Sequence, residues 1–298
     1  MPTEDVSPRH VHLDEWPILD AVESMWEGQM SAVAAVRPAL PAVAGAVAAA
    51  AAVLGDTGRL VYAGAGTSGR VAVQDGAELP PTFGWPLERL VFAMAGGMDA
   101  LVASAEGAED DEDDAARQIE AAALGPADVL IAIAASGTTP FTVAAARAAS
   151  ARGAVTIGIA NNAGAPLLAS CRHPILIETG SEVIAGSTRM KAGTAQKVVL
   201  NLISTGIMTA LGRIHAGLMV NMHLANAKLR LRAERMVAHI AGCDAEQAAA
   251  ALARAGGDIK RAVLIALGAD EPTARAALDR SRGNLRRALV EVPGSARS

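Results

Sequence analysis

The chain has 298 residues, of which 51% are hydrophobic and 2% aromatic, and its formal net charge at pH 7 is −5. This length and hydrophobic content can bury one large core or two unequal ones. An acidic chain without a basic block is poorly suited to nucleic acid, because neutralisation of phosphates dominates that binding, and so few aromatic residues argue against a base-stacking surface.

Targeting signals and cysteine pairs are not evident in the sequence. The first ten residues carry neither the cationic nor the apolar region of a signal peptide. The apolar stretch 38–55 is mostly alanine, and we interpret it as a packed helix that is too short and too weakly apolar to span a bilayer. Cys171 and Cys243 are far apart and form no C-x-x-C motif, so we expect reduced thiols. A cytoplasmic protein without membrane contact is therefore predicted.

Five short apolar runs alternate with helical stretches along the first part of the chain. They are nearly continuous rather than alternating, which is typical of strands buried on both faces. The predicted strands are Arg59–Ala63, Arg89–Met94, Asp128–Ala134, Val155–Ala160 and Pro174–Glu178. Strands that alternate with helices predict an α/β fold, a parallel sheet sandwiched between helices, which binds ligands outside the carboxyl ends of its strands.

Helices alone are predicted after the last strand. One long, mostly buried helix begins near Ser187 or Thr188, which would cap it, and a second runs from Ala216 to about Ile240. From Gly242 onward, glycines separate what we interpret as three short amphipathic helices. We therefore expect an α/β domain over residues 1–240 and a small helical domain over residues 241–298.

The loop after the first predicted strand, Gly64–Gly69, reads G-x-G-x-x-G, the letter pattern of a dinucleotide site. Such a site needs an acid at the tip of the second strand to bind the ribose. That tip is Met94–Gly97 here, and Asp99 lies beyond its glycines. The sequence therefore argues against NAD, and we expect no cofactor.

Small residues and hydroxyls recur instead at three predicted helix starts. Free N–H groups and the helix dipole at such starts suit a phosphate. Any single loop could hold ordinary N-caps, but repetition of one design at the ends of the sheet favours a compact phosphomonoester. The candidate binding residues are Gly66, Thr67, Ser68, Ser136, Gly137, Thr139 and Ser187.

Two of these loops, GAGTSGR and AASGTTP, resemble the phosphate loops of sugar isomerase domains, which bind phosphosugars. The longer segments GAGTSGRVAVQDGAELPPTFG, AEGAEDDED and GSTRMKAGTAQK are similar to the N-acetylmuramic acid 6-phosphate etherase family, over nearly the whole chain. The resemblance implies a homodimer that cleaves a lactyl ether by β-elimination and water addition, without a metal. The chain departs from the usual family pattern at Ala77, Leu79, Thr138 and Asn221.

The same resemblance implies two catalytic carboxylates, Glu78 and Glu109. Glu78 lies where the first helix should end, before a double proline, and a carboxylate there opposes the helix dipole. That placement hints at function, although a solvated surface acid is the alternative. The residues alone do not favour Glu109 over Glu106 or Asp110, because acids in the first turn of an exposed helix stabilise it.

Two other functions share parts of this pattern. A phosphosugar isomerase would use the same loops and remove the same C2 proton, but it has no ether to cleave. A non-catalytic regulator, similar to the glucokinase regulatory protein, would keep the loops and could lose the acids; the presence of Glu78 and Glu109 favours the enzyme.

The six histidines form no ligand cluster, so no metal is expected. The alanine-rich helix Pro41–Gly55 and the helix from Ser187 are apolar enough to form a dimer interface.

Overall fold

The computed structural model describes residues 1–103 and 105–292. They form two compact units, the first made of Met1–Ala77 and Glu88–Ile207, the second of Glu78–Leu87 and Met208–Ser298. The expected boundary at residues 240 and 241 differs from this division. The second unit begins at Met208 rather than at residue 241, and it also includes the internal segment Glu78–Leu87.

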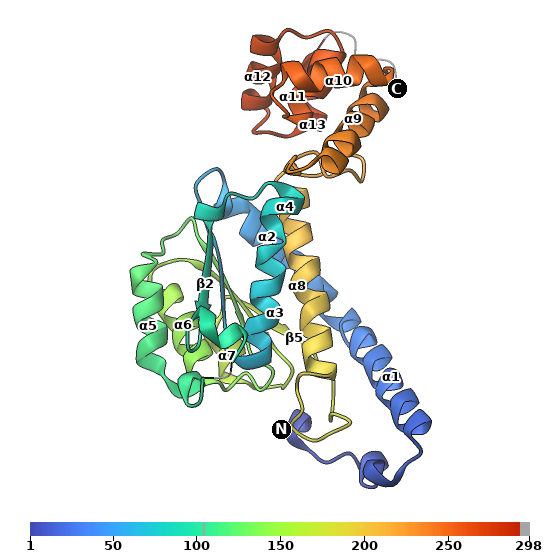
Figure 1. Cartoon of the computed structure of the whole chain (residues 1–298). Coiled ribbons are helices and arrows are strands. Elements are labelled where there is room, and N and C mark those ends of the chain that lie inside the picture. The colour runs from blue at the N-terminus through green and yellow to red at the C-terminus, as the bar shows by residue number, and fades with distance from the viewer. Residues whose placement is uncertain (104, 293–298) are drawn as a thin grey trace. The chain divides into compact units, whose positions relative to one another are not determined.

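A sheet of five parallel strands forms the centre of the first unit, in the order β2-β1-β3-β4-β5 (Figure 1). All five predicted strands are present, and the parallel α/β prediction is confirmed. β1, β3 and β4 are buried along their whole length, which explains their uninterrupted apolar sequences. The strands are β1 Leu60–Gly64, β2 Leu90–Met94, β3 Val129–Ile133, β4 Val155–Ala160 and β5 His173–Leu176.

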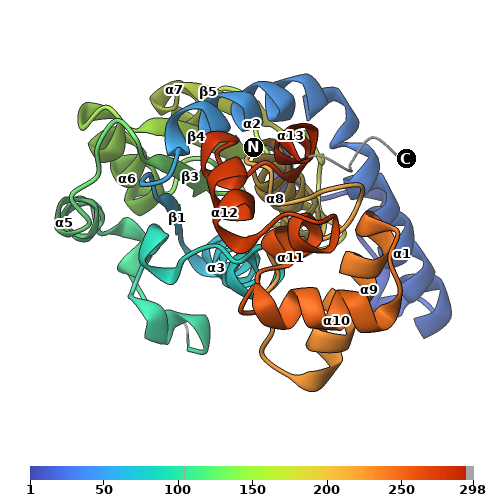
Figure 2. The ribbon, with the colours of Figure 1, turned by 90° about the horizontal axis from the view of Figure 1, so that it is seen from above.

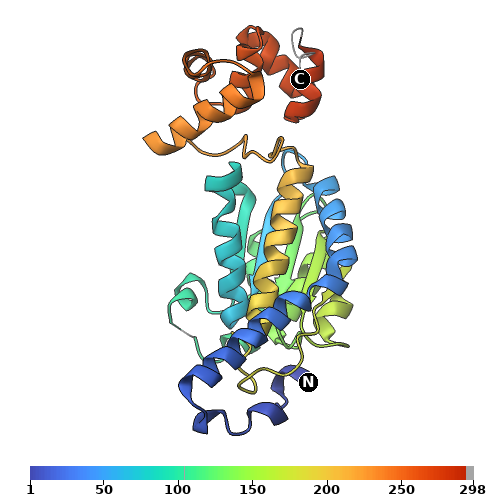
Figure 3. The ribbon, with the colours of Figure 1, turned by 90° about the vertical axis from the view of Figure 1, so that its right-hand side faces the viewer.

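Helices cover both faces of this sheet (Figures 1 and 3). On one face lie α5 Glu112–Ala121, α6 Pro140–Ala151 and α7 Pro166–Ser170. Side chains such as Ile119 and Phe141 form a core there with Val61 and Leu130 of the strands. The other face carries α2 Leu40–Leu54, α3 Gly66–Ala77 and α8 Lys191–Ala210, the last of which is the predicted long, mostly buried helix.

The N-terminal part of the first unit is α1, Ile18–Ala34, which a 3-10 turn at Arg37–Ala39 connects to α2. Among the described residues, one helical stretch, Ile18–Leu54, meets the length and composition of a membrane span. The stretch is not one continuous helix, because the turn and its proline, Pro38, interrupt it. The short 3-10 helices are η1 Pro2–Glu4, η2 Pro8–His10, η3 Leu13–Glu15, η4 Arg37–Ala39, η5 Leu87–Arg89, η6 Met98–Leu101 and η7 Ala108–Asp110.

The second unit is helical, and Figure 2 shows its C-terminal helices as a bundle. Within the described residues, four helices follow residue 242, not the three expected, because three glycine breaks separate four segments. Each starts with an Asp or Asn whose side chain accepts a backbone N–H three residues ahead, the preferred N-cap bond. The helices are α4 Leu79–Phe83, α9 Ala227–Ala241, α10 Ala245–Arg254, α11 Ile259–Ala266, α12 Glu271–Arg280 and α13 Leu285–Glu291.

The predicted helix from Ala216 is wrong over its first part. Ala216 and Gly217 have φ of 47° and 76°, a left-handed conformation that a right-handed helix cannot contain. The helix begins only at Ala227, where the side chain of Asn226 accepts the backbone N–H of Leu229. The composition of residues 216–226 is compatible with a helix, and only the backbone conformation reveals the interruption.

Candidate active site

The two neighbouring strands β1 and β3 mark the place where a ligand is expected. The chain proceeds from β1 outward to β2 on one side, and from β3 outward to β4 and β5 on the other. Connections that leave in opposite directions open a crevice at the carboxyl ends of the strands. Gly64 pairs with Ile133 in register, so the loops that follow both strands start side by side. These are the first two loops predicted to bind phosphate.

The first loop leads directly into α3. Gly66 begins this helix with φ of +51° and is exposed, and Thr67 is half-buried. The bond from the N–H of Gly69 to the carbonyl oxygen of Ala65, at 2.9 Å, opens the helix, and the N–H groups before it have no intrahelical acceptor. The start of α3 therefore presents free donors to an anion at the edge of the sheet.

Ser68, in the same turn, is buried at 8% exposure. Its hydroxyl lies 2.9 Å from Oε1 of Gln196, a fully buried side chain of α8. The sequence predicted a hydroxyl offered to the ligand, whereas the structure places it toward the protein interior. Gln196 was not singled out from the sequence, and its position in the GSTRMKAGTAQK segment was the available signal.

The second loop contains a tight turn. The N–H of Thr138 donates to Oγ of Ser136 at 3.1 Å, and Gly137 has φ of +68°. Thr139 stands at the N-cap of α6, but its hydroxyl makes no capping bond, and Pro140 follows it. The simple N-cap interpretation therefore does not explain Thr139, and this half-buried residue is compatible with ligand binding.

Replacing Gly137 by alanine should destabilise the protein through two separate effects. The added Cβ would lie 2.4 Å from Cβ of Ala165, and the left-handed φ is strained for any residue with a Cβ. Together they should lower the free energy of unfolding by ~2–4 kcal/mol. Gly164→Ala is the matched control, because Gly164 has φ of +71° but open space around its Cβ. Urea unfolding curves that are equal for the two variants would contradict a steric requirement at Gly137.

The third predicted element is not an open helix start, which corrects the interpretation of Ser187. The helix α8 begins at Lys191, after a turn, and not at Ser187 or Thr188. Its first N–H groups, those of Lys191 and Ala192, donate to the two carboxylate oxygens of Glu182, each at 2.9 Å. Because this buried carboxylate already occupies the helix N-terminus, no anion site is free there. Ser187 lies half-buried in the turn before it.

The first and third elements nevertheless meet. A Cβ added to Gly193 of α8 would lie 3.5 Å from the methyl carbon of Thr67 and 3.3 Å from the carbonyl oxygen of Thr188. The absence of a side chain at Gly193 thus lets the start of α8 approach the first loop closely. The residues of the GSTRMKAGT segment therefore lie beside the start of α3, although they do not offer helix N–H groups.

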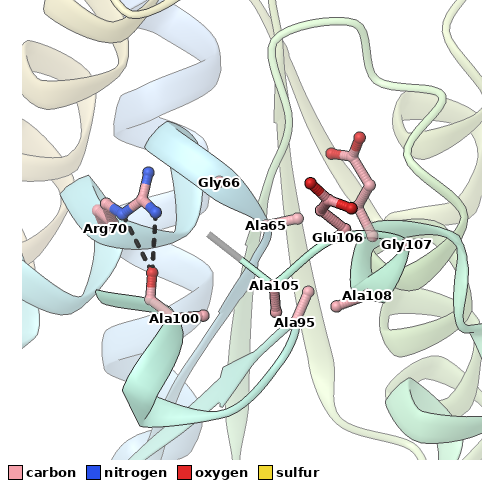
Figure 4. A pocket seen from close by; sticks show the side chains of 10 residues that line it. Ala65, Gly66, Arg70, Ala95, Ala100, Ala105, Glu106, Gly107 and Ala108 are labelled. Atoms are coloured by element: carbon pink, nitrogen blue, oxygen red, sulfur yellow. Dashed lines mark hydrogen bonds between the residues drawn. The ribbon is translucent and has the colours of Figure 1, made fainter. Parts of the chain in front are cut away.

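Two acids line a pocket beside this helix start (Figure 4). Glu106 and Glu109 both belong to it, whereas Asp110, the third sequence candidate, does not line it. The pocket has a volume of about 220 Å³, and its lining includes Ala65 and Gly66. Both glutamates are exposed. The structure therefore brings Glu109 next to the predicted phosphate loop without separating it from Glu106.

Arg70 is a cation of this pocket that the sequence reasoning did not single out. Its guanidinium donates to the carbonyl oxygens of Ala100 and Leu101 at 2.9–3.1 Å. In the view of Figure 4, Arg70 and Glu106 lie on opposite sides of the pocket. The signal for Arg70 was its place directly after the glycine loop, in GTSGR. The pocket thus combines a fixed positive charge with two carboxylates.

Glu78, the other acid, lies where α3 ends and α4 begins. It is exposed, has helical φ and ψ of −82° and −13°, and makes no side-chain capping bond. The double proline that follows occupies the first turn of α4, where proline is favoured, and does not only terminate α3. Glu78 is therefore at a helix junction and not simply at a helix C-terminus, and its side chain is exposed to solvent.

Asp75, one turn before Glu78, is a buried acid whose hydrogen bonds stabilise the fold. Its carboxylate accepts hydrogen bonds from the Tyr62 hydroxyl at 3.0 Å, the Ser204 hydroxyl at 3.2 Å and the Asn201 amide. Burial raises the pKa of Asp75 above its ordinary value, and the three donors partly oppose that rise. These bonds tie the last turn of α3, which lies just before Glu78 in the chain, to β1 and α8.

Comparisons with known proteins give matches over most of the chain. A family model described as the glucokinase regulatory protein N-terminal SIS domain matches residues 42–150, and one described as the SIS domain matches residues 108–205. An N-acetylmuramic acid 6-phosphate etherase of Deinococcus radiodurans is 50% identical over 263 residues, which cover 88% of this chain and 86% of that protein. One of Cutibacterium acnes is 44% identical over 265 residues, covering 89% of this chain and 87% of that protein.

Among solved structures, a phosphoheptose isomerase from Francisella tularensis superposes with a TM-score of 0.51. It is 20% identical and covers 65% of this chain and all of its own. At this level of identity the likeness concerns the fold alone. It identifies the parallel sheet and its helices as an arrangement shared with a phosphosugar enzyme.

Proposed function

The chain belongs to the N-acetylmuramic acid 6-phosphate etherase family, and we infer from its relatives that it is a lyase that cleaves the D-lactyl ether of N-acetylmuramic acid 6-phosphate. The products are N-acetylglucosamine 6-phosphate and D-lactate. The observation that carries this conclusion is the 50% identity to an etherase over 88% of the chain. The free N–H groups at the start of α3 support it, because they suit the phosphate of such a substrate.

The reaction needs proton transfer and neither a metal nor a nucleotide. An unactivated ether resists direct hydrolysis, but the aldehyde of the open-chain sugar acidifies the C2 proton. A base removes that proton, the C3 lactate leaves with the help of an acid, and water adds to the unsaturated aldehyde. We propose Glu78 as the acid that protonates the departing lactate oxygen. Glu109 is the partner that either removes the C2 proton or activates the water.

For the phosphate we propose the two open loops at the carboxyl ends of β1 and β3. Gly66, Thr67 and Ser68 contribute backbone N–H groups at the start of α3, and Thr67 adds its hydroxyl. The neighbouring loop completes the proposed site with Ser136, Gly137 and Thr139. Ser187 is the remaining candidate, in the turn before α8. Short hydroxyl side chains and bare backbone favour one compact phosphate over an extended dinucleotide.

Lactate release from N-acetylmuramic acid 6-phosphate by the purified protein is the direct test. We expect stoichiometric D-lactate and N-acetylglucosamine 6-phosphate, unchanged by added NAD or by a metal chelator. A phosphosugar isomerase would rearrange an aldose phosphate without releasing lactate, and a regulator would bind the sugar phosphate without turnover. Either outcome would contradict the etherase assignment.

A homodimer is the second proposal, and its surface is the exposed face of α1. Ile18, Leu19 and Trp26 are 78%, 64% and 63% exposed, and together with Val22, Met30 and Val33 they follow the helical repeat along one side. So large an apolar stripe on a surface helix marks an interface, and a second copy of the chain would cover it. The apolar residues of α8 proposed from the sequence are largely buried inside the first unit, whereas α2 buries Val43, Ala46, Ala50 and Leu54 and leaves others, such as Leu40, exposed. The cytoplasmic location stays a prediction.

Solution mass tests the dimer. The protein should have twice the mass of one chain, 30.2 kDa, at micromolar concentration, and Trp26→Glu should shift it toward the monomer by burying a charge at the interface. Val102→Glu is the control, because Val102 is an apolar residue outside α1 that is even more exposed, at 94%. A wild-type monomer would contradict the proposal, and binding of α1 to lipid vesicles would identify a membrane as the occupant.

A further inference from the structure

Thr3 is a buried polar residue in a segment that is otherwise exposed. It lies in η1 and is 0% exposed, whereas the two residues on either side of it are exposed. Burial of a polar residue is unfavourable unless it forms hydrogen bonds, so the partners of Thr3 should explain its position. These partners lie in the segments that follow β4 and β5, at the carboxyl end of the sheet.

The first partner is Asn162, which follows β4 and is 3% exposed. Its Oδ1 accepts the backbone N–H of Thr3 at 3.4 Å, and its Nδ2 donates to the hydroxyl oxygen of Thr3 at 3.0 Å. The same Nδ2 donates to the carbonyl oxygen of Ala135 at 2.9 Å. A carbonyl oxygen can only accept, so this orientation of the amide is required, and both of its protons are used. Because Ala135 directly precedes Ser136, Asn162 connects Thr3 to the start of the second loop.

The second partner is the turn before α8. The N–H of Gly186 donates to the carbonyl oxygen of Thr3 at 3.1 Å, and Gly186 has φ of +72°. A Cβ added to Gly186 would lie 2.9 Å from a carboxylate oxygen of Glu4, so η1 packs closely on this turn. Ser187 follows directly. Thr3 is therefore bonded to the residue before Ser187 and, through Asn162, to the residue before Ser136.

The two segments connected in this way both carry residues proposed to bind the phosphate. We propose that Thr3 and Asn162 are positioning residues, which hold the second loop and the turn before α8 in the arrangement that binds the phosphate. Positioning rather than contact is indicated, because the protons of the Asn162 amide are already used within the protein. Groups that bind a ligand must be held to within about 0.5 Å, so loss of this connection weakens binding. The inference rests on the proposed phosphate site and adds the N-terminal segment to it.

Thr3→Val tests the proposal with a small change. Valine has nearly the shape of threonine but no hydroxyl, so one proton of the Asn162 amide loses its acceptor while the backbone bonds of Thr3 remain. The Kd of inorganic phosphate and the KM for the substrate should rise about threefold to tenfold. The kcat should change little, because Glu78 and Glu109 are not touched. Thr3→Ser keeps the hydroxyl and should retain wild-type values.

Asn162→Leu removes all three side-chain bonds and should weaken phosphate binding about tenfold or more. The double variant with Thr3→Val should bind no more weakly than Asn162→Leu alone, because the shared bond is lost only once. If Asn162→Leu folds poorly, the comparison of Thr3→Val with Thr3→Ser still decides the question.

Thr156→Val is the matched control for a purely structural role. Thr156 is also 0% exposed, and its hydroxyl oxygen accepts the N–H of Arg172 at 2.9 Å, but it lies at the opposite end of β4 from Asn162. It should lower the free energy of unfolding about as much as Thr3→Val does, and leave phosphate binding unchanged. Titration calorimetry with inorganic phosphate and urea unfolding measure the two quantities separately.

The outcomes separate the inference from the function on which it rests. If Thr3→Val binds phosphate as the wild type does and loses only stability, as Thr156→Val does, the connection is structural and the inference is wrong. A loss of affinity that Thr3→Ser shares equally also contradicts it, because the hydroxyl is then not the cause. If the wild-type protein binds no inorganic phosphate, the proposed phosphate site itself is wrong and the inference fails with it. Weaker phosphate binding in Thr3→Val, with wild-type binding in Thr3→Ser and Thr156→Val, supports the inference.

Discussion

Replacing Glu78 by glutamine should stop the release of lactate while the C2 proton of the substrate still exchanges with solvent. Exchange needs only a base and the aldehyde, whereas departure of the lactate needs a proton on its oxygen. Glutamine has the size of glutamate but no acidic proton to donate. Loss of a general acid against so poor a leaving group should lower the rate of lactate release by ~10²–10⁴-fold.

A proton NMR time course in D₂O measures both processes in one sample. The signal at C2 should decline at close to the wild-type rate in Glu78→Gln, and free lactate should not accumulate. Glu88→Gln, an exposed acid ten residues along the chain, should leave both rates unchanged. Normal lactate release would refute the acid assignment. Loss of exchange together with cleavage would make Glu78 the base at C2.

The segment that begins with Glu78 is held firmly within the second unit. Nη1 of Arg213 donates to the carbonyl oxygens of Phe83, the last residue of α4, and of Gly84, its C-cap, at 2.8 Å and 2.7 Å. The guanidinium also lies 5.0 Å from the ring centre of the buried Trp85. This support explains why residues 78–87 group with the C-terminal unit despite lying between α3 and β2 in the chain.

The strands could be predicted from the sequence because strands that are buried on both faces consist almost entirely of apolar residues. Segments such as Val129–Ile133 are apolar at every residue, and the structure buries all of them. The loops at the ends of β1 and β3 were predictable for a related reason: Gly66 and Gly137 occupy backbone conformations that favour glycine. Local composition was therefore sufficient to predict those elements whose structure depends mainly on their own residues.

The remaining features depend on partners that are distant in sequence. The start of α8 was misplaced because Glu182, nine residues before Lys191, supplies the cap that Ser187 was expected to supply. The direction of the Ser68 hydroxyl depends on Gln196, 128 residues away. No pattern within either segment reports such a contact. The division of the chain likewise depends on how residues 78–87 pack, which the sequence around them does not reveal.

The second large effect should follow from replacing Glu109 by glutamine. The acids from Asp111 onward have a structural explanation, because Asp111 accepts the N–H of Asp114 at 2.8 Å as the N-cap of α5, and acids in the first turn favour that helix. The pocket beside Gly66 is lined by Glu106 and Glu109. Similarity to the etherases selects Glu109, and its loss should lower overall turnover by ~10²–10⁴-fold.

The same NMR experiment identifies which step Glu109 catalyses. If it removes the C2 proton, Glu109→Gln should lose both deuterium exchange and lactate release. If it activates the water, lactate should still appear, and the unsaturated aldehyde should accumulate with an ultraviolet absorbance that the saturated product lacks. Asp110→Asn is the control expected to retain activity, since Asp110 does not line the pocket. A larger loss in Glu106→Gln than in Glu109→Gln would transfer the assignment to Glu106, because both carboxylates lie close enough to the phosphate loop for the geometry to permit either.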